Sequence, residues 1–152
     1  LSTRSPEMGL LQKTKELEST LVAFSPVGRS LLTDNPLKSD VCSTLPFMKV
    51  NPRFQEGNYD RNIQRTNKLR SFASDLGVST SGLAIAWLLA QGEHVIPIPG
   101  TRSVDHLNEL AAGVDLELSS SDIEAIEKVL PIGWCYGDRY SDDQWQGPER
   151  YC

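Results

Sequence analysis

Two stretches with matching chemistry decide the fold: residues 94–103 read HVIPIPGTRS, and residues 21–30 read LVAFSPVGRS. The run 94–100 predicts a strand in which Pro97 has no N–H to donate, so ladder pairing there is one-sided or irregular. The run 21–24 is apolar without polar alternation, which is typical of a strand buried on both faces. Each strand is expected to end in a turn that carries Gly, Arg and Ser.

Helical signals lie on both sides of these strands. Gly77 stands where a C-cap glycine belongs, and Ser121 with Glu124 forms an S-x-x-E pattern that predicts a capping box. N-cap residues are expected at three further positions: Ser5, Ser79 and Ser103. With apolar residues spaced three or four apart, these signals predict helices over 5–17, 58–76, 79–90, 103–111 and 121–130.

The helix over 5–17 is expected to have an apolar face, as is the helix that follows Ser103; their apolar residues are Leu10, Leu11 and Leu17 in the first and Leu107, Leu110 and Ala111 in the second. The segment 28–57 has little periodicity and contains Pro36, Pro46 and Pro52. It predicts a long irregular loop, and such loops are usually functional or mobile.

Strands separated by helices indicate parallel pairing and an α/β class. Only two strands are visible, however, and a two-stranded parallel sheet has two open edges and encloses no core. The length of 152 residues suits one domain. The strand count instead predicts part of a larger sheet. The first residue, Leu1, agrees either with processing of the chain or with a missing N-terminal part.

The composition excludes several function classes. The net charge is -5, from 15 Lys and Arg against 20 Asp and Glu, which disfavours nucleic-acid binding. No apolar run approaches the ~20 residues of a membrane helix. Three widely spaced cysteines, Cys42, Cys135 and Cys152, match neither a paired disulfide framework nor a zinc pattern, and His94 and His106 are too far apart to suggest a metal site. Without a signal peptide or glycosylation sequon, a cytoplasmic location is expected.

The two turns predict a ligand site. Residues 25–30, SPVGRS, and 99–103, PGTRS, each follow a strand, and ligands of α/β folds bind beyond the carboxyl ends of parallel strands. The second turn also opens a helix, whose free N–H groups favour an anion. An arginine fork matches phosphate. The residues alone therefore support two readings equally: a phosphorylated ligand across both strand ends, or two ordinary turns with solvated arginines.

Five short motifs resemble those of the aldo-keto reductases, in family order. FSPVGR at 24–29 resembles the family's (Y/F)SPLGRG strand end, and IPIPGTRS at 96–103 resembles its PIPGT(K/R) cofactor loop. PRF at 52–54, LAIAW at 83–87 and GDRY at 137–140 are similar to three further segments. The resemblance runs from about residue 10 to 140 and is specific as a set.

The resemblance implies a fold and a reaction. The family is a (β/α)8 barrel that reduces aldehydes and ketones with NADPH, so residues 1–152 are expected to form the C-terminal half of a barrel, with 132–152 as its tail. The family's catalytic Asp, Tyr, Lys and His lie on earlier strands. The tyrosines present here fall outside strand ends, so no catalytic residue is assigned; they are Tyr59, Tyr136, Tyr140 and Tyr151.

The cofactor residues carry over one at a time. Phe24 matches the aromatic residue that stacks on nicotinamide, and Arg102 matches the residue that selects the 2′-phosphate of NADPH. Ser25, Val27 and Arg29 match the pyrophosphate loop, Gly100 and Thr101 the adenosine phosphate, Glu109 a residue near adenine, and His106 a position that is often basic or polar. Two positions depart from the family: Leu110 replaces a common Asn, and Ser30 a common Gly.

The resemblance leaves alternatives open. The chain is expected to act with a small carbonyl substrate as part of a reductase, or else as a non-catalytic nucleotide-binding or interaction module. Its partner is expected to be the missing N-terminal half or a second copy of the chain. The tail aromatics support two readings: Trp134, Tyr136 and Tyr140 line a substrate pocket, or they simply pack the tail.

Overall fold

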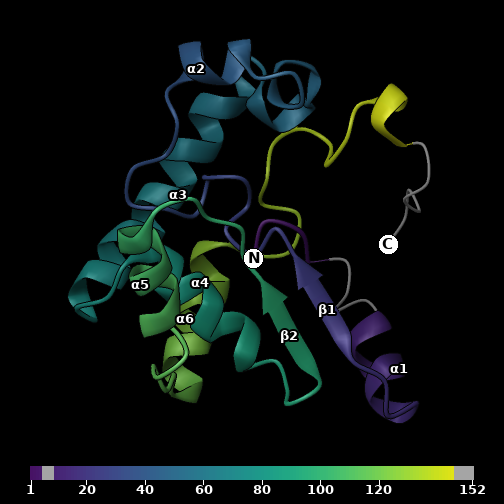
Figure 1. Ribbon diagram of the computed structural model, residues 1–152, viewed down its shortest axis with the longest axis vertical. Helices are drawn as coiled ribbons and strands as arrows, with labels where there is room; N and C mark the ends of the chain where they lie inside the picture. The colour runs from purple at the N-terminus through teal and green to yellow at the C-terminus, as the bar shows by residue number, and fades with distance from the viewer. Residues whose placement is uncertain (5–8, 146–152) are drawn as a thin grey trace.

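The computed structural model describes residues 1–4 and 9–145 of the chain. Its sheet, in the described residues, has two parallel strands, β1 (Leu21–Phe24) and β2 (Val95–Ile98). They pair in continuous register, with Leu21 opposite Val95 and Phe24 opposite Ile98. Both strands and their parallel direction are therefore confirmed, and Pro97 pairs on one side only because β2 has β1 as its single neighbour there (Figure 1).

The prediction that the first strand is buried on both faces is wrong. Exposure alternates along β1, and Val22 and Phe24 keep 53% and 50% of their surface accessible. Ile96 and Ile98 of β2 do the same, at 51% and 50%. The helices cover one face of the sheet, and in the described chain the four residues that point to the other face stay about half exposed. An apolar run shows that both faces of a strand are compatible with burial. It does not supply the second layer of protein that would bury the other face.

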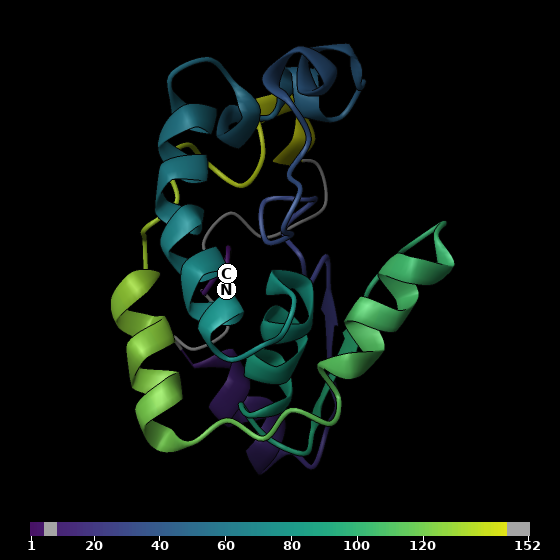
Figure 2. The same ribbon diagram turned by 90° about the vertical axis from the view of Figure 1, so that its left-hand side faces the viewer.

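Four helices form the layer beside the sheet: α3 (Asn58–Asp75), α4 (Thr80–Leu89), α5 (Val104–Ala112) and α6 (Ser120–Val129). α4 packs against α3, α5 and β2, and α6 lies along α3 (Figures 1 and 2). Ser79 and Ser103 accept hydrogen bonds from Gly82 N and His106 N, so both predicted N-caps are confirmed. Gly77 has φ +70°, as a C-terminal glycine requires.

The capping box of the last helix begins two residues earlier than predicted. Ser119 Oγ accepts from Asp122 N at 3.2 Å, and Ser119 N donates to Asp122 Oδ2 at 2.9 Å. Asp122, and not Glu124, is therefore the acidic residue of the capping box. The sequence Ser119-Ser120-Ser121 offers three capping hydroxyls in a row, and the short Asp side chain reaches back as well as Glu does.

Two predicted apolar faces are largely exposed. α1 (Leu10–Glu16) buries none of its residues, and Leu10 and Leu17 are 46% and 64% exposed. The predicted start of this helix at Ser5 and Pro6 lies outside the described residues. In α5, Leu110 is buried, whereas Leu107 is 53% exposed. Both helices lie at the margins of the structure (Figure 1), so their apolar faces have little to pack against.

The segment predicted to be one irregular loop holds short regular pieces. α2 (Ser39–Thr44) is followed by 3-10 turns at Met48–Val50 and Pro52–Phe54. Asn51 caps the last turn by accepting from Arg53 N at 3.2 Å. Cys42 and Phe54 reach the core from these pieces. Elements of three to six residues are too short to show a period, which is why the sequence pattern missed them.

α4 is the central helix because its residues are buried on every side. All positions from Thr80 through Trp87 are buried. α5 approaches it without side chains between them: a Cβ on Gly113 would lie 2.2 Å from the carbonyl oxygen of Gly82. The core around α4 gathers apolar and aromatic residues from the whole length of the described chain: Leu1, Leu31, Leu32, Phe54, Tyr59, Leu69, Leu83, Trp87, Ile126, Leu130 and Trp134.

The tail docks onto the rest of the chain through two buried amides. Asn62 Nδ2 donates to the carbonyl of Tyr136 at 3.0 Å, and Asn62 Oδ1 accepts from Tyr136 N at 2.8 Å. Asn51 Nδ2 donates to the carbonyl of Arg139 at 2.7 Å. Trp134 is 5% exposed and donates to Leu1 O. This favours the packed-tail reading for Trp134.

Among the described helices, no single one is long and apolar enough to cross a membrane, although α3 and α4, which meet at 86°, meet the length and composition requirement as a pair.

Candidate cofactor site at the strand ends

The turn after β1 has an unusual backbone. Ser25, Gly28, Arg29 and Ser30 have φ values of +51°, +59°, +56° and +77°, in the left-handed region that favours glycine. Three of these four residues carry side chains, and such conformations persist only where their surroundings enforce them. Ser30 Oγ accepts from Leu37 N at 3.2 Å, which helps to hold the turn at the position where the family commonly has Gly.

The turn after β2 leads directly into α5. Thr101 Oγ1 accepts from Ser103 N at 3.2 Å, and Ser103 Oγ accepts from His106 N at 3.4 Å. Gly100 is exposed, and a Cβ there would meet no heavy atom within 4 Å. The backbone at Gly100 is therefore open to an approaching group, beside the start of α5.

The two turns face one cavity of about 810 Å³. Seven of the nine predicted site residues line it: Val27, Arg29, Gly100, Thr101, Arg102, His106 and Glu109. The cavity also has acidic walls, because Asp34 and Glu109 contribute to it. Asp34 accepts from Thr80 N at 3.0 Å and from the Thr80 hydroxyl, and Glu109 accepts from Ser81 Oγ at 3.2 Å. Hydrogen bonds from α4 thus engage both carboxylates, while Arg29 and Arg102 bring positive charge.

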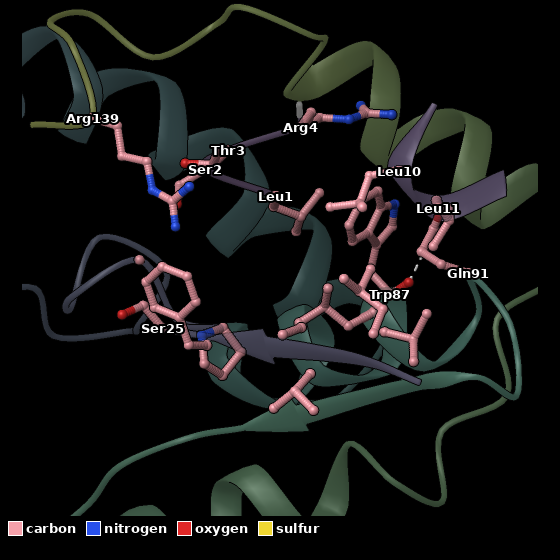
Figure 3. A pocket seen from close by; sticks show the side chains of 18 of the residues that line it. Leu1, Ser2, Thr3, Arg4, Leu10, Leu11, Ser25, Trp87, Gln91 and Arg139 are labelled. Atoms are coloured by element: carbon pink, nitrogen blue, oxygen red, sulfur yellow. Dashed lines mark hydrogen bonds between the residues drawn. The ribbon is translucent and has the colours of Figure 1, made fainter. Parts of the chain in front are cut away.

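The other two predicted residues, Phe24 and Ser25, line a neighbouring cavity of about 280 Å³. Arg29 lines both cavities, so the two cavities are adjacent. Figure 3 shows this second cavity, with Arg139 reaching from the tail toward Ser25. The guanidinium carbon of Arg139 lies 4.6 Å from the centre of the Phe24 ring. The half-exposed ring of Phe24 therefore offers a flat surface, against which the planar guanidinium of Arg139 packs.

Sequence reasoning missed several residues of the walls. Thr33, Asp34, Asn35, Leu37 and Ser81 line the larger cavity, and Arg139 lines the smaller one. The Asp34-Asn35-Pro36 turn is a local signal that was available for two of them. Ser81 and Arg139 carry no local signal, because each comes to its cavity only through the packing of distant segments.

Comparison with known proteins accounts for this arrangement. The family model described as "Aldo/keto reductase family" matches residues 1–131. An aldo-keto reductase of Schizosaccharomyces pombe, yakc, named with NADP(+), is 31% identical over 140 residues, which are 92% of this chain and 41% of that protein. A probable aldo-keto reductase 1 of Glycine max is 34% identical over 140 residues, 92% of this chain and 40% of its own length. The chain thus spans about 40% of the curated relatives it matches.

Solved structures show the same fold. A thermostable aldo-keto reductase in complex with the inhibitor epalrestat matches with a TM-score of 0.56 and 25% identity, over 82% of this chain and 35% of that one. The glycerol dehydrogenase of Gluconobacter oxydans matches with a TM-score of 0.67 and 22% identity, over 84% of this chain and 38% of that one.

The prediction of a partial (β/α)8 barrel is therefore confirmed: two parallel strands and their helices superpose on about a third of larger reductases. The family model covers most of the sequence, including both strand-end turns. This chain belongs to the aldo/keto reductase family.

Proposed function

We propose that the chain is the C-terminal portion of an NADPH-dependent aldo-keto reductase and supplies part of its cofactor site. The observation that supports this most is the shared cavity: two turns that lie more than 70 residues apart in the sequence bring Arg29 and Arg102 to its lining. The name of the S. pombe relative includes NADP(+), which agrees with a phosphorylated dinucleotide.

The residues present fit such a group. Its phosphates need cations and free N–H groups, and the cavity offers Arg29, Arg102 and the N-terminus of α5. Gly100 leaves its backbone uncovered, so a phosphate can approach closely. Arg102 is exposed on the cavity wall at the helix start, where it is able to bind the 2′-phosphate that distinguishes NADPH from NADH. Leu110, which is buried and lines the same cavity, adds an apolar contact where the family commonly has Asn.

Phe24 and the turn after β1 would orient the reactive end of the cofactor. Phe24 offers a half-exposed ring at the carboxyl end of β1, and Ser25 is fixed beside it with φ +51°. A ring stacked on Phe24 would have one face covered and the other open to a substrate. When bound, NADPH supplies the hydride that reduces an aldehyde or ketone to an alcohol.

We expect the proton donor to come from other strands of the barrel, beyond the two strands of the described residues. Tyr59 is buried, and its hydroxyl donates to the carbonyl of Leu37. Burial raises the pKa of Tyr59 far above its ordinary value, helped by the nearby Cys42, which is the opposite of what a catalytic acid needs. Tyr140 accepts from Arg29 and is 8% exposed. We therefore assign no catalytic residue in this chain.

The uncovered sheet face supports a protein partner. Val22, Phe24, Ile96 and Ile98 form one apolar surface on the side of the sheet opposite the helices. The remaining strands of a barrel would cover this surface and both edges of the sheet. We expect the partner to be the N-terminal half of the barrel, or a second copy of the chain that completes the sheet.

Titration with NADPH and NADH tests the proposal. The purified chain is expected to bind NADPH more tightly than NADH, measured by nicotinamide fluorescence. The substitution Arg102→Ala is expected to raise the Kd for NADPH about tenfold, as the loss of one charge-assisted contact does, and to leave NADH unchanged. Arg65→Ala removes an exposed arginine from α3 and serves as the control.

Two results would contradict the proposal. One is equal affinity for NADPH and NADH that Arg102→Ala does not alter. The other is ordinary reductase turnover by this chain alone, because it would require a complete catalytic set within these residues. NADPH binding without any activity after addition of an N-terminal half-barrel would favour the non-catalytic binding module instead.

A further inference from the structure

The segment that follows β1 forms part of the lining of the larger cavity. Arg29, Ser30, Thr33 and Asp34 all line it, so the shape of the cavity depends on the course of the backbone through residues 29–34. That course is strained, because Arg29 and Ser30 have φ +56° and +77° although neither is glycine. Contacts with the rest of the chain must therefore hold this segment in place.

Arg70 of α3 binds the backbone of the segment at two points. Its Nε donates to the carbonyl of Thr33 at 2.7 Å, and its Nη2 donates to the carbonyl of Leu31 at 2.8 Å. These two nitrogens form one edge of the planar guanidinium, so a single rigid group sets the positions of both carbonyls. Leu31 directly follows Ser30, the last of the residues with positive φ in this turn.

The third nitrogen of the guanidinium is bound to α3 itself. Arg70 Nη1 donates to Thr66 Oγ1 and to Asn67 Oδ1, each at 2.9 Å. Thr66 is fully buried, and its hydroxyl donates in turn to the carbonyl of Ile63 at 3.1 Å. Because the guanidinium is fixed to the helix through one nitrogen and to the segment through the other two, it transmits the position of α3 to the cavity lining.

Two further hydrogen bonds tie the segment to the helices, but they act later in the chain. Thr80 N, at the start of α4, donates to Asp34 Oδ1 at 3.0 Å, and the Tyr59 hydroxyl donates to the carbonyl of Leu37. Both accepting residues lie beyond Thr33. The bonds from Arg70 are therefore the ones that act beside the strained residues.

The contacts of Arg70 depend on its shape as well as on its charge. Its four hydrogen bonds end on carbonyl, hydroxyl and amide oxygens, all of which are neutral. A guanidinium presents two N–H groups along one edge at a fixed spacing, whereas a lysine ammonium is a point charge on a flexible stem. Burial lowers the pKa of Arg70 from its ordinary value, and the negative charge of Asp34 opposes this shift. A test must therefore separate the position of the group from its charge.

We propose that Arg70 is a positioning residue of the cofactor cavity, which holds the backbone at Leu31 and Thr33 against α3 and so keeps Arg29 and Ser30 in the conformation that lines the cavity. What the cavity binds rests on the function proposed above, whereas the link between Arg70 and the segment does not. Arg70 is not among the described residues that line the cavity. Its effect on binding therefore has to pass through the segment or through its charge.

Hydrogen exchange of backbone amides, followed by NMR, tests the link without any ligand. Leu32 N donates to the carbonyl of Val27 at 3.1 Å and reports on the turn, and Leu130 N donates to the carbonyl of Ile126 at 2.9 Å and reports on the fold as a whole. In Arg70→Gln, the amide of Leu32 is expected to exchange about tenfold faster relative to that of Leu130. An unchanged ratio would overturn the proposal, because the segment would then keep its position without Arg70.

Coupling between substitutions tests the effect on the cofactor. Arg70→Gln is expected to raise the Kd for NADPH about tenfold in the full chain. If Arg70 acts through Arg29, the same substitution should change the Kd by less than about twofold in Arg29→Ala, and still by about tenfold in Arg102→Ala, whose side chain lies in the other turn. Equal effects in the two backgrounds would overturn the proposal, since a general loss of folded protein acts on both alike.

Two variants separate position from charge and from folding. Arg70→Lys keeps the charge and is expected to raise the Kd nearly as much as Arg70→Gln; full affinity in Arg70→Lys would assign the effect to charge and overturn the proposal. Thr66→Val keeps the arginine but removes an oxygen that orients it, and is expected to raise the Kd about threefold. It takes the place of Arg70→Gln in both measurements if that variant does not fold. Arg65→Gln, which removes an exposed arginine from the same helix, is the control.

The two proposals fail separately. If the unsubstituted chain binds no NADPH, the function proposed above fails, and the exchange ratio still decides whether Arg70 holds the segment. If NADPH binds selectively but Arg70→Gln leaves its Kd unchanged, only the role of Arg70 is wrong.

Discussion

Asn62 shows how much one polar side chain can hold together in this structure. It is fully buried on α3 and makes hydrogen bonds to the carbonyl of Arg53 and to both backbone groups of Tyr136. One side chain thus joins the turn at 52–54, the longest helix and the tail. The sequence offered no sign of this role, because an Asn within a helical pattern usually indicates an exposed position.

Replacing Asn62 is expected to destabilise the fold and release the tail. The substitution Asn62→Leu keeps the volume but removes the side-chain partner of three part-buried backbone groups, which costs about 2–4 kcal/mol of unfolding free energy. Urea unfolding measures this, with Gln64→Leu, an exposed position on the same helix, as the control. A loss below about 0.5 kcal/mol for Asn62→Leu would show that water replaces the amide there.

Buried weak acids make the fold sensitive to alkaline pH. Burial raises the pKa of the Cys135 thiol from 9.0 to about 11, and it also raises the pKa values of Cys42 and Tyr59. Between about pH 9 and 11 the unfolded chain releases protons that the folded chain retains. The free energy of unfolding should therefore be unaffected by these groups below pH 9 and should fall as the pH rises above it.

The Cys135→Ala variant isolates one of these groups. Wild type is expected to lose about 1–2 kcal/mol more than the variant between pH 8.5 and pH 10.5, in urea unfolding at each pH. The difference between the two proteins should be constant from pH 6 to pH 8.5. Parallel losses over the alkaline interval would mean that the Cys135 thiol ionises as easily in the folded chain as in the unfolded one.

At the scale of elements, the contact between α4 and α5 depends on two glycines. The backbones of Gly82 and Gly113 approach so closely that a Cβ on Gly113 would lie 2.2 Å from Gly82 O and 2.9 Å from Gly82 Cα. Gly113 has φ -70°, an ordinary value for any residue. The requirement for glycine is therefore one of space and not of backbone conformation.

Gly113→Ala is expected to force α5 away from α4 at a cost of about 3 kcal/mol, since the clash is with backbone that no rotamer change relieves. Thermal unfolding measures it. Gly100→Ala is the control, because its Cβ would meet no heavy atom within 4 Å, and its stability should stay within about 0.5 kcal/mol of wild type. Since α5 carries His106 and Glu109, Gly113→Ala should also weaken NADPH binding.

Sequence patterns predicted the elements best where each element supplies its own signals. α3, α4 and α5 were found from their spacing, their serine caps and Gly77, all of which are local. The capping box was placed wrongly because three consecutive serines compete for one role. The burial of β1 was wrong because exposure depends on what lies opposite a strand, and no local pattern records that.

At the scale of the whole molecule, the candidate site was predicted through resemblance rather than through pattern. The motifs named nine residues, and the fold brings seven of them to one cavity and the other two to its neighbour. Arg139 was missed because its approach to Phe24 joins positions more than 110 residues apart. Contacts of that separation follow from the complete packing of the chain, which short motifs do not contain.

The bare apolar surface made by Val22, Phe24, Ile96 and Ile98 has a practical consequence for anyone who prepares this protein. Chaperones recognise exposed apolar surfaces, and at high protein concentration molecules associate through them. Yield and solubility should therefore improve on co-expression with a complementary half-barrel, and dilute, cold handling should suit the chain when it is made by itself.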